Sequence, residues 1–344
     1  MTQSDADRSS ASANRVYLEV AAIVGPVYLV GGSVRDLLMG RPCDDYDFAT
    51  PLRPDEVESA VSAAGRRPHV TGKRFGTIGF SVSGHKVEVT TFRAETYTGA
   101  SRRPEVEYLD DLGDDLARRD FTVNAIALRG DAFIDPHDGR ADIAAKRLRA
   151  VGDPSQRFAE DPLRMLRAAR FVSQLGFTVE PATAAGISAG ADSILHVARE
   201  RRAAELDKLL AGGDVAGGLR TLAVTGLLGY LLPELALQAA LPNPGPGQGG
   251  TLWDHTVDAV AATSSDIRLR WATLLRDVAA PYLAGTGVFS GDRPSRGSET
   301  LGAEIAERIG LNLRWSVERR EAVRGLVAHQ MDVDSPLRTA DTSS

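Results

Sequence analysis

The chain has 344 residues, a formal net charge of −6 and one cysteine, Cys43. One cysteine excludes an internal disulfide framework and a cysteine-rich zinc site. We expect a cytoplasmic protein with no membrane segment, because no apolar run approaches the roughly 18–20 residues that span a bilayer and the N-terminal segment is polar. The negative charge argues against indiscriminate nucleic-acid binding but leaves room for a local basic surface.

The first half of the chain predicts an α/β domain over residues 15–150, after a disordered tail at 1–14. Its pattern mixes short apolar strands with helices and glycine turns. In chain order, the expected elements are a helix at Val16–Val24, a strand at Val27–Val30, a helix from Ser33 as N-cap to Met39, a strand at Asp45–Phe48, and a hairpin of strands at Ile78–Val82 and Lys86–Thr91.

Beyond Asp153 the strand pattern stops and helical spacing takes over. We expect an all-α neck and body over 151–240, a linker at 241–250, a further helical domain over 251–332 and a disordered tail at 333–344. The expected neck helices cover 163–172, 199–210 and 217–227. The fold class is therefore an α/β head with a small mixed sheet, followed by helical domains.

Two aspartates follow a double glycine in an order that suits phosphate chemistry. The segment VGGSVRD at 30–36 precedes DDYDF at 44–48. Because side chains alternate along a strand, Asp45 and Asp47 are expected to share one face and to bind a divalent metal, and Mg²⁺ prefers such oxygen ligands. Glycines let backbone amides approach a triphosphate, and the next helix N-terminus favours anions. A simple polar turn is the alternative.

The run VGGSVRDLLMGRPCDDYDFAT at 30–50 resembles the signature of the tRNA nucleotidyltransferase/poly(A) polymerase family, the bacterial-type class of the DNA polymerase beta superfamily. The resemblance covers roughly residues 26–235. It implies that Asp45 and Asp47 are catalytic Mg²⁺ ligands and that Gly32 and Arg35 contact the nucleotide. It also makes the α/β domain a nucleotidyltransferase head.

Three further features extend the resemblance through the head. The superfamily uses a third carboxylate on a neighbouring strand, for which Glu88 is the candidate, with an exposed strand residue as the alternative. RRDFTVNA at 118–125 resembles the second family motif and implies that Arg119 lies near the sugar and phosphates. Residues 94–113 resemble the flexible loop that the family links to the switch from adding C to adding A.

The segment EDPLRMLRAARF at 160–171 resembles the motif by which the family selects the base. We expect Asp161 and Arg164, three residues apart, to share a helix face. A carboxylate accepts from the exocyclic amine of cytosine or adenine, and a guanidinium donates to the neighbouring ring atoms. The resemblance implies that this pair selects C and A and that Arg167 and Arg170 continue toward the phosphates. The alternative is an ordinary helix start with Asp161 as N-cap.

A stripe of arginines in the neck is where we expect the acceptor stem of tRNA, read by its shape and phosphates. The stripe comprises Arg147, Arg149, Arg157, Arg164, Arg167, Arg170, Arg199, Arg201 and Arg202.

Residues 252–330 resemble a degenerate HD-type phosphohydrolase domain. His255 and Asp277 stand at two of its metal-ligand positions, and His329 is a further candidate. Arg276 replaces the histidine of the His-Asp pair, and a guanidinium repels a cation. We therefore expect neither phosphohydrolase activity nor a metal there.

The resemblance implies template-independent addition of CCA to the tRNA 3′ end from CTP and ATP. Alternatives within the family are a poly(A) polymerase and an enzyme that adds only CC or only A. A non-catalytic RNA-binding protein and a small-molecule nucleotidyltransferase are alternatives of other classes. The sequence leaves the oligomeric state open.

Overall fold

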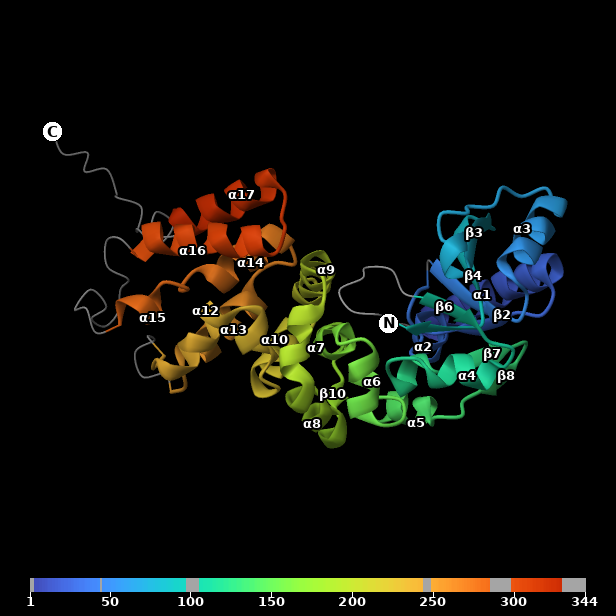
Figure 1. Cartoon of the computed structure of the whole chain (residues 1–344), viewed down its shortest axis with the longest axis horizontal. Helices are drawn as coiled ribbons and strands as arrows, with labels where there is room; N and C mark the ends of the chain where they lie inside the picture. Colours follow the sequence, from blue (N-terminus) through green and yellow to red (C-terminus); the bar gives the residue numbers. More distant parts are fainter. Residues whose placement is uncertain (1–2, 44, 97–104, 244–248, 285–297, 330–344) are drawn as a thin grey trace. The chain divides into compact units, whose positions relative to one another are not determined.

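A computed structural model of the chain divides into two compact units (Figure 1). Unit 1 comprises residues 1–161 and 178–186, and unit 2 comprises 162–177 and 187–344. The structure describes residues 3–43, 45–96, 105–243, 249–284 and 298–329. The tail predicted at 333–344 lies outside the described residues. Among the described residues, no helix is both long enough and apolar enough to cross a bilayer.

Unit 1 is built on a mixed sheet, as the sequence predicts. The sheet has six strands in the order β3-β4-β2-β1-β7-β8. β2 and β4 pair in parallel, and the other neighbours pair antiparallel. The strands are β1 (Tyr28–Val30), β2 (Asp45–Thr50), β3 (Thr77–Val82), β4 (His85–Thr91), β7 (Ala127–Arg129) and β8 (Ala132–Ile134). Two separate pairs are the antiparallel β5 (Arg93–Thr96) with β6 (Glu105–Tyr108), and the parallel β9 (Arg147–Leu148) with β10 (Thr178–Val179).

Helices cover both faces of this sheet. The helices of unit 1 are α1 (Gln3–Val24), α2 (Gly32–Leu38), α3 (Pro54–Ala63), α4 (Leu112–Ala117), α5 (Gly139–Ala144) and α6 (Pro154–Glu160), with 3₁₀ turns η1 (Lys73–Phe75) and η2 (Thr122–Asn124). Side chains of α1, α2 and α3 form one core with Tyr46 and Phe48 of β2, and α4 forms a smaller core with Ala49. Since side chains alternate along a strand, Asp45 and Asp47 lie on the α4 face, opposite α1 to α3.

Two predictions about where helices and strands occur in unit 1 are wrong. Helix α1 extends into the predicted disordered tail, because Ala13 is buried against the sheet core and the Ser12 hydroxyl bonds the side chains of His85 and Tyr46. Strands also do not stop at Asp153, because β10 returns to pair with β9. The predicted loop at 94–113 contains parts of β5, β6 and α4, and its residues 97–104 lie outside the described residues.

Unit 2 is helical in its described residues. α8 (Pro181–Gly190) crosses from unit 1, and the unit contains α7 (Leu163–Leu175), η3 (Ala191–His196), α9 (Arg199–Leu210), α10 (Val215–Val224), α11 (Leu227–Leu231), α12 (Pro233–Ala236), η4 (Leu237–Ala240), α13 (Leu252–Ala262), α14 (Ile267–Leu275), α15 (Ala280–Leu283), α16 (Ser298–Asn312) and α17 (Val317–Ala328). The predicted helix at 199–210 matches α9 residue for residue. α7 packs against α9 and α10.

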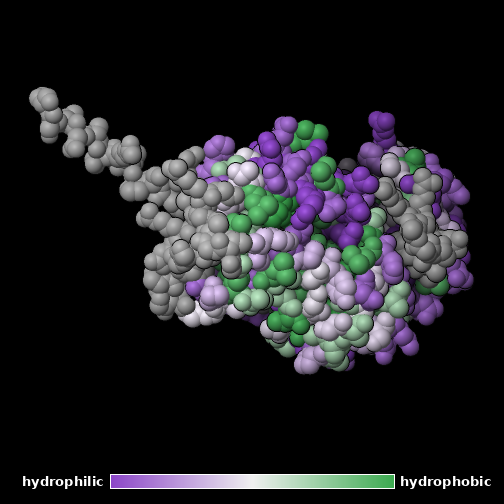
Figure 2. Space-filling view, turned by 60° about the vertical axis from the view of Figure 1, so that its left-hand side comes forward, coloured by the Kyte–Doolittle hydropathy of each residue, from purple (hydrophilic) through white to green (hydrophobic). Residues whose placement is uncertain are grey.

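The later helices of unit 2 are joined to α9 by a polar and aromatic cluster. Arg319 of α17 donates to both carboxylate oxygens of Asp207 in α9, at 2.7 and 2.6 Å, and Trp271 of α14 donates to Asp207 at 2.8 Å. The rings of Trp271 and Trp315 meet edge to face at 4.8 Å, and the Arg319 guanidinium lies 4.3 Å from the Trp315 ring centre. Figure 2 shows hydrophobic surface interspersed with hydrophilic surface on the face in view.

Candidate active site

Three carboxylates share the α4 face of the sheet. The parallel register of β2 and β4 pairs Asp47 directly with Glu88, and Asp45 with Lys86. Asp45, Asp47 and Glu88 are all exposed, whereas the alternating residues Tyr46 and Phe48 are buried. The structure therefore places the candidate third carboxylate beside the Asp-x-Asp pair, as the sequence hypothesis requires.

The environment of Asp47 disfavours its charged form. Loss of hydration within the surrounding protein raises the pKa of Asp47 from 3.8 to about 6, with further contributions from the negative charges of Glu88 and Asp45. The positive charge of Arg119 acts in the opposite direction. A cation bound between these carboxylates would relieve the repulsion, because an opposite charge favours ionisation.

Ser33 joins the helix after the glycines to the strand that carries the aspartates. Its hydroxyl accepts from the Asp47 amide at 3.0 Å and donates to the Asp45 carbonyl at 3.3 Å. The prediction that Ser33 caps α2 is wrong: the N-cap is Gly31, at a φ of 69°, and Ser33 lies inside the helix. The hydroxyl thus fixes β2 against the glycine turn.

Arg119 lies over the glycine turn. A Cβ added at Gly31 would meet Nη1 of Arg119 at 2.8 Å, so a larger residue there would displace the guanidinium from its present position. The positive φ of Gly31 independently favours glycine there. Nη1 of Arg119 also donates to the Asn124 carbonyl at 3.4 Å. The structure therefore places Arg119 at the glycine turn. Contact of Arg119 with the sugar and phosphates, which the second-motif resemblance implies, stays a prediction.

Asp115 of α4 holds Arg119 in place through an ion pair. It is 1% exposed, and its carboxylate lies 3.0 Å from Nη2 of Arg119 and 2.6 Å from Nη2 of Arg118. Burial alone would raise the pKa of Asp115, but the two guanidinium groups outweigh burial and hold that pKa below its ordinary value. The carboxylate is therefore a buried charged anchor for Arg119.

Arg35 is held by Asn124 of η2 and by its neighbour Asp36 in α2. Its Nη1 donates to Asn124 Oδ1 at 2.7 Å, and Asn124 Nδ2 donates to Asp120 Oδ1 at 3.0 Å. Its Nε and Nη2 donate to Asp36 at 3.0 and 2.9 Å. Arg35 is 8% exposed. Because Asn124 belongs to the second motif, that motif holds this arginine of the first motif in place.

The base-selecting segment differs from both sequence interpretations. Asp161 has an extended backbone (φ −145°, ψ 101°), and α7 begins at Leu163 with Pro162 as its N-cap. Asp161 therefore lies before α7 and not on its face, and the N-cap residue is Pro162 instead of Asp161. Asp161 belongs to unit 1 and Arg164 to unit 2. Base selection by this pair stays a prediction.

Two other arginines of α7 contact aromatic and acidic groups of unit 2. Arg170 is 8% exposed, lies 3.0 Å from the Glu205 carboxylate of α9, and lies 4.1 Å from the Phe171 ring centre. Arg167 is half-buried, and its guanidinium lies 5.5 Å from the same ring. These contacts favour a structural role for Arg170, and nucleotide contact by either arginine stays a prediction.

In the degenerate HD-like region, the Arg276 guanidinium contacts both candidate metal ligands, His255 and Asp277. Its Nη2 lies 2.6 Å from Nε2 of His255 and 2.8 Å from Oδ2 of Asp277. His329 is exposed, and its Nδ1 lies 2.8 Å from the Gly325 carbonyl. Within the described residues, no group of three or more His, Cys, Asp or Glu side chains has the arrangement of a metal site.

Sequence reasoning missed the residues that hold the site together. Ser33, Asp115 and Asn124 contact the predicted site residues, and Asp120 contacts Asn124. From the sequence, Ser33 was expected only as a helix cap, and Asp115 and Asp120 were assigned no role. For Asp115 a signal existed: it stands three and four residues before Arg118 and Arg119, the spacing of helical ion pairs.

Comparison with known proteins matches both units. Residues 27–149 match the poly A polymerase head domain, and residues 176–238 match a domain described as a probable RNA and SrmB-binding site of polymerase A. The CCA-adding enzyme of Lacticaseibacillus paracasei is 45% identical over 216 residues, which are 62% of this chain and 53% of that enzyme. The CCA-adding enzyme of Leuconostoc citreum is 36% identical over 264 residues, 74% of this chain and 64% of that enzyme.

The chain spans about half the length of the first of these relatives. Among solved structures, the CCA-adding enzyme of Bacillus stearothermophilus in complex with CTP is 29% identical with a TM-score of 0.61, over 97% of this chain and 82% of that chain.

One conclusion follows from the two domain matches together with the geometry of the site, namely the carboxylates on β2 and β4 and the glycine turn with its two arginines. The chain belongs to the tRNA nucleotidyltransferase/poly(A) polymerase family, whose members use a divalent metal.

Proposed function

We propose that this protein adds CMP and AMP to the 3′ end of tRNA without a nucleic-acid template, using CTP and ATP. The observation that carries the proposal is the register of Asp45, Asp47 and Glu88 beside a glycine turn held by Arg35 and Arg119. The similarity to CCA-adding enzymes supports tRNA as the acceptor. The cytoplasmic location expected from the sequence stays a prediction.

The reaction is a phosphoryl transfer. The RNA 3′-oxygen forms a bond to the α-phosphorus of the nucleotide, the bond from that phosphorus to the pyrophosphate oxygen breaks, and the hydroxyl proton leaves to solvent. Gly31 and Gly32 let the turn approach the triphosphate, and Arg35 and Arg119 supply positive charge already fixed in place.

We assign a divalent cation, Mg²⁺, to the carboxylates of Asp45 and Asp47, with Glu88 as the third. The donor type fits, because oxygen ligands suit Mg²⁺ and the strand register sets Glu88 beside Asp47. The three carboxylates do not form a ready-made metal cluster within the described residues. When bound, such a cation activates the attacking hydroxyl and stabilises the leaving pyrophosphate.

The experiment is incorporation of labelled CTP and ATP, separately and together, onto tRNA transcripts that end before CCA, after C and after CC. Addition of CCA followed by arrest is the expected result. Addition of CC alone or A alone would make the protein one half of a split system, and long A tails would make it a poly(A) polymerase. No incorporation with Mg²⁺ present would favour the non-catalytic RNA-binding alternative.

A further inference from the structure

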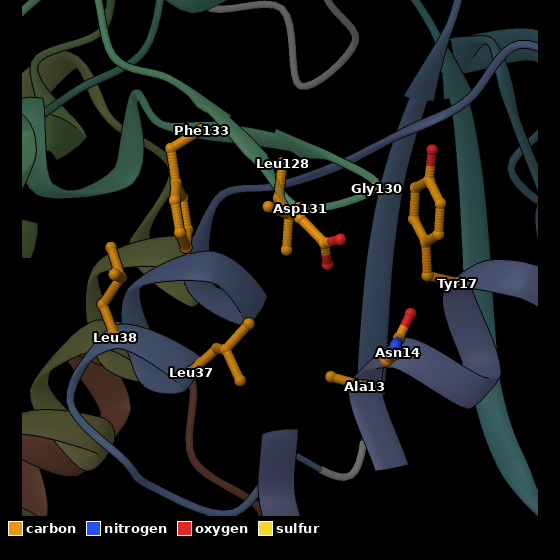
Figure 3. Close-up of a pocket in the computed structure, with 9 residues that line it drawn as sticks. All are labelled: Ala13, Asn14, Tyr17, Leu37, Leu38, Leu128, Gly130, Asp131 and Phe133. Atoms are coloured by element: carbon orange, nitrogen blue, oxygen red, sulfur yellow. The ribbon is translucent and has the colours of Figure 1, made fainter. Parts of the chain in front are cut away.

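A pocket of about 360 Å³ opens in unit 1 between α1, α2 and the β7–β8 hairpin. Figure 3 shows that its lining comes from these three parts of the chain. Tyr17 belongs to α1, Leu37 and Leu38 to α2, and Asp131 and Phe133 to the hairpin. The volume falls at the lower end of the range for small-molecule sites.

This pocket lies on the opposite side of the sheet from the catalytic carboxylates. Tyr17 and Leu128, which line the pocket, belong to the same hydrophobic core as Tyr46 and Phe48. Side chains alternate along β2, so Asp45 and its partner carboxylates point to the other face. An occupant of the pocket would therefore not compete with a nucleotide for the carboxylates.

The lining combines an apolar wall with one negative charge. Leu37, Leu38, Leu128 and Phe133 provide the apolar surface, and the carboxylate of Asp131 borders the same open space (Figure 3). Among the lining residues that the structure describes, none is Lys or Arg. A ligand with an apolar body and one cationic group would bury its body and place its charge by Asp131.

Two neighbouring groups bear on this chemistry. Arg140 lies over the Phe133 ring, 4.9 Å from its centre, without lining the pocket. Asn14 lines the pocket and adds a neutral amide, which tolerates either charge. Asp131 is therefore the lining residue whose charge selects the ligand.

We propose that this pocket is a second ligand site of the head, and that it binds small apolar amines. The proposal is independent of the proposed function, because it assigns no role in nucleotide transfer to any residue that lines the pocket.

The test uses phenethylamine as the probe, with 2-phenylethanol as its neutral counterpart and 3-phenylpropionate as an anionic one. Binding to the full chain is measured by calorimetry and ligand-observed NMR, with CTP and Mg²⁺ present to occupy the carboxylate face. We expect saturable binding of phenethylamine with a Kd on the order of 1 mM, and binding of the alcohol about tenfold weaker.

Variants at Asp131 make the test specific. Asp131→Asn should weaken phenethylamine binding about tenfold, and Asp131→Lys should abolish it and allow 3-phenylpropionate to bind instead. Asp131 is exposed, so both variants should fold, which circular dichroism checks. The exposed Asp110→Asn is the matched control and should bind like the wild type.

Three results would overturn the proposal. They are the absence of saturable binding up to about ten times the expected Kd, equal binding of the amine and the alcohol, and unchanged amine binding in Asp131→Lys.

Discussion

Asp47 and Glu88 lie side by side because β2 and β4 pair in parallel with these two residues in register. The pairing brings two like charges together on an exposed face, and it contributes to raising the pKa of Asp47 to about 6. Repulsion of this kind weakens the fold and prepares the site for a cation. The first two predictions follow from it.

Replacing Asp45 or Asp47 by Ala should reduce nucleotide incorporation by about 10³-fold or more, because the metal loses a ligand. The fold should persist, since both side chains are exposed. Incorporation of labelled CTP at saturating Mg²⁺ measures the loss, and Asp110→Asn serves as the control carboxylate in the same unit. Near-normal activity in either alanine variant would remove the assignment.

In metal-free buffer, Asp47→Asn should stabilise the protein at pH 7.5. The folded pKa of about 6 exceeds the unfolded value of 3.8, so the protonated form favours folding. That contribution is complete below pH 3.8 and is lost as the pH rises through 6. Because Asp47 is solvent-exposed, we expect a discounted gain on the order of 1 kcal/mol at pH 7.5 and none at pH 3.5.

Urea unfolding of the wild type and of Asp47→Asn at the two pH values measures this difference. Added Mg²⁺ should stabilise the wild type more than the variant, since binding to the folded state raises stability. A variant that is less stable at pH 7.5 without metal would contradict the pKa assignment.

Asp115→Asn should raise the KM for CTP more than it lowers kcat, because it loosens Arg119 over the Gly31 turn. It should also lower the free energy of unfolding by about 3 kcal/mol, since it leaves two half-buried guanidinium groups without the buried anion that they share.

Asp142→Asn separates these two effects. Asp142 is also buried and pairs with two arginines, Arg147 and Arg149, but neither arginine belongs to the glycine turn. It should lose similar stability and keep the KM for CTP at a temperature where both variants are folded. Equal KM changes in the two variants would reduce Asp115 to a structural residue.

Asp161→Ala should relax base choice, with UTP incorporated about tenfold better relative to CTP, because the acceptor for the exocyclic amine is lost. Competition between labelled UTP and CTP on a tRNA that ends before CCA measures the ratio. Glu160→Ala, at the neighbouring position, is the control. Unchanged discrimination against UTP would rule out Asp161 as a base-selecting group.

Asp207→Ala should destabilise unit 2 by about 2–3 kcal/mol, because Arg319 and Trp271 lose their shared acceptor. Thermal unfolding followed by tryptophan fluorescence measures the loss, because all three tryptophans of the chain, Trp253, Trp271 and Trp315, belong to unit 2. Arg220→Ala breaks the exposed pair with Asp258 and should change stability by less than about 0.5 kcal/mol. Similar effects of the two variants would show that the cluster adds no special stability.

Sequence patterns predicted what depends on local chemistry. Strand alternation fixed the shared face of Asp45 and Asp47, and helical spacing identified α9 at its observed bounds. The contacts that position Arg35 and Arg119 could not be predicted in the same way. Asn124 reaches Arg35 across 89 residues of chain, and such a contact depends on how η2 and α2 pack.

In the segment before α7, the local sequence pattern itself predicted the wrong backbone conformation. Its residue types suggested an ordinary helix start, yet the backbone stays extended at Asp161 and the helix begins two residues later. Residue spacing could not decide whether Asp161 is helical or extended. Pro162 fits the first turn of a helix, but a proline also favours an extended conformation in the residue before it.

The alternation of β2 also limits how this head can change over evolutionary time. Adding or deleting one residue between Asp45 and Phe48 would turn the shifted side chains to the opposite face, placing carboxylates in the core and aromatic rings in water. Such a change would remove the metal ligands and disrupt the core at the same time. An insertion or deletion in β2 therefore cannot abolish the activity and leave the fold intact. A lineage that abandons catalysis should instead retain the strand length and replace the aspartates one at a time.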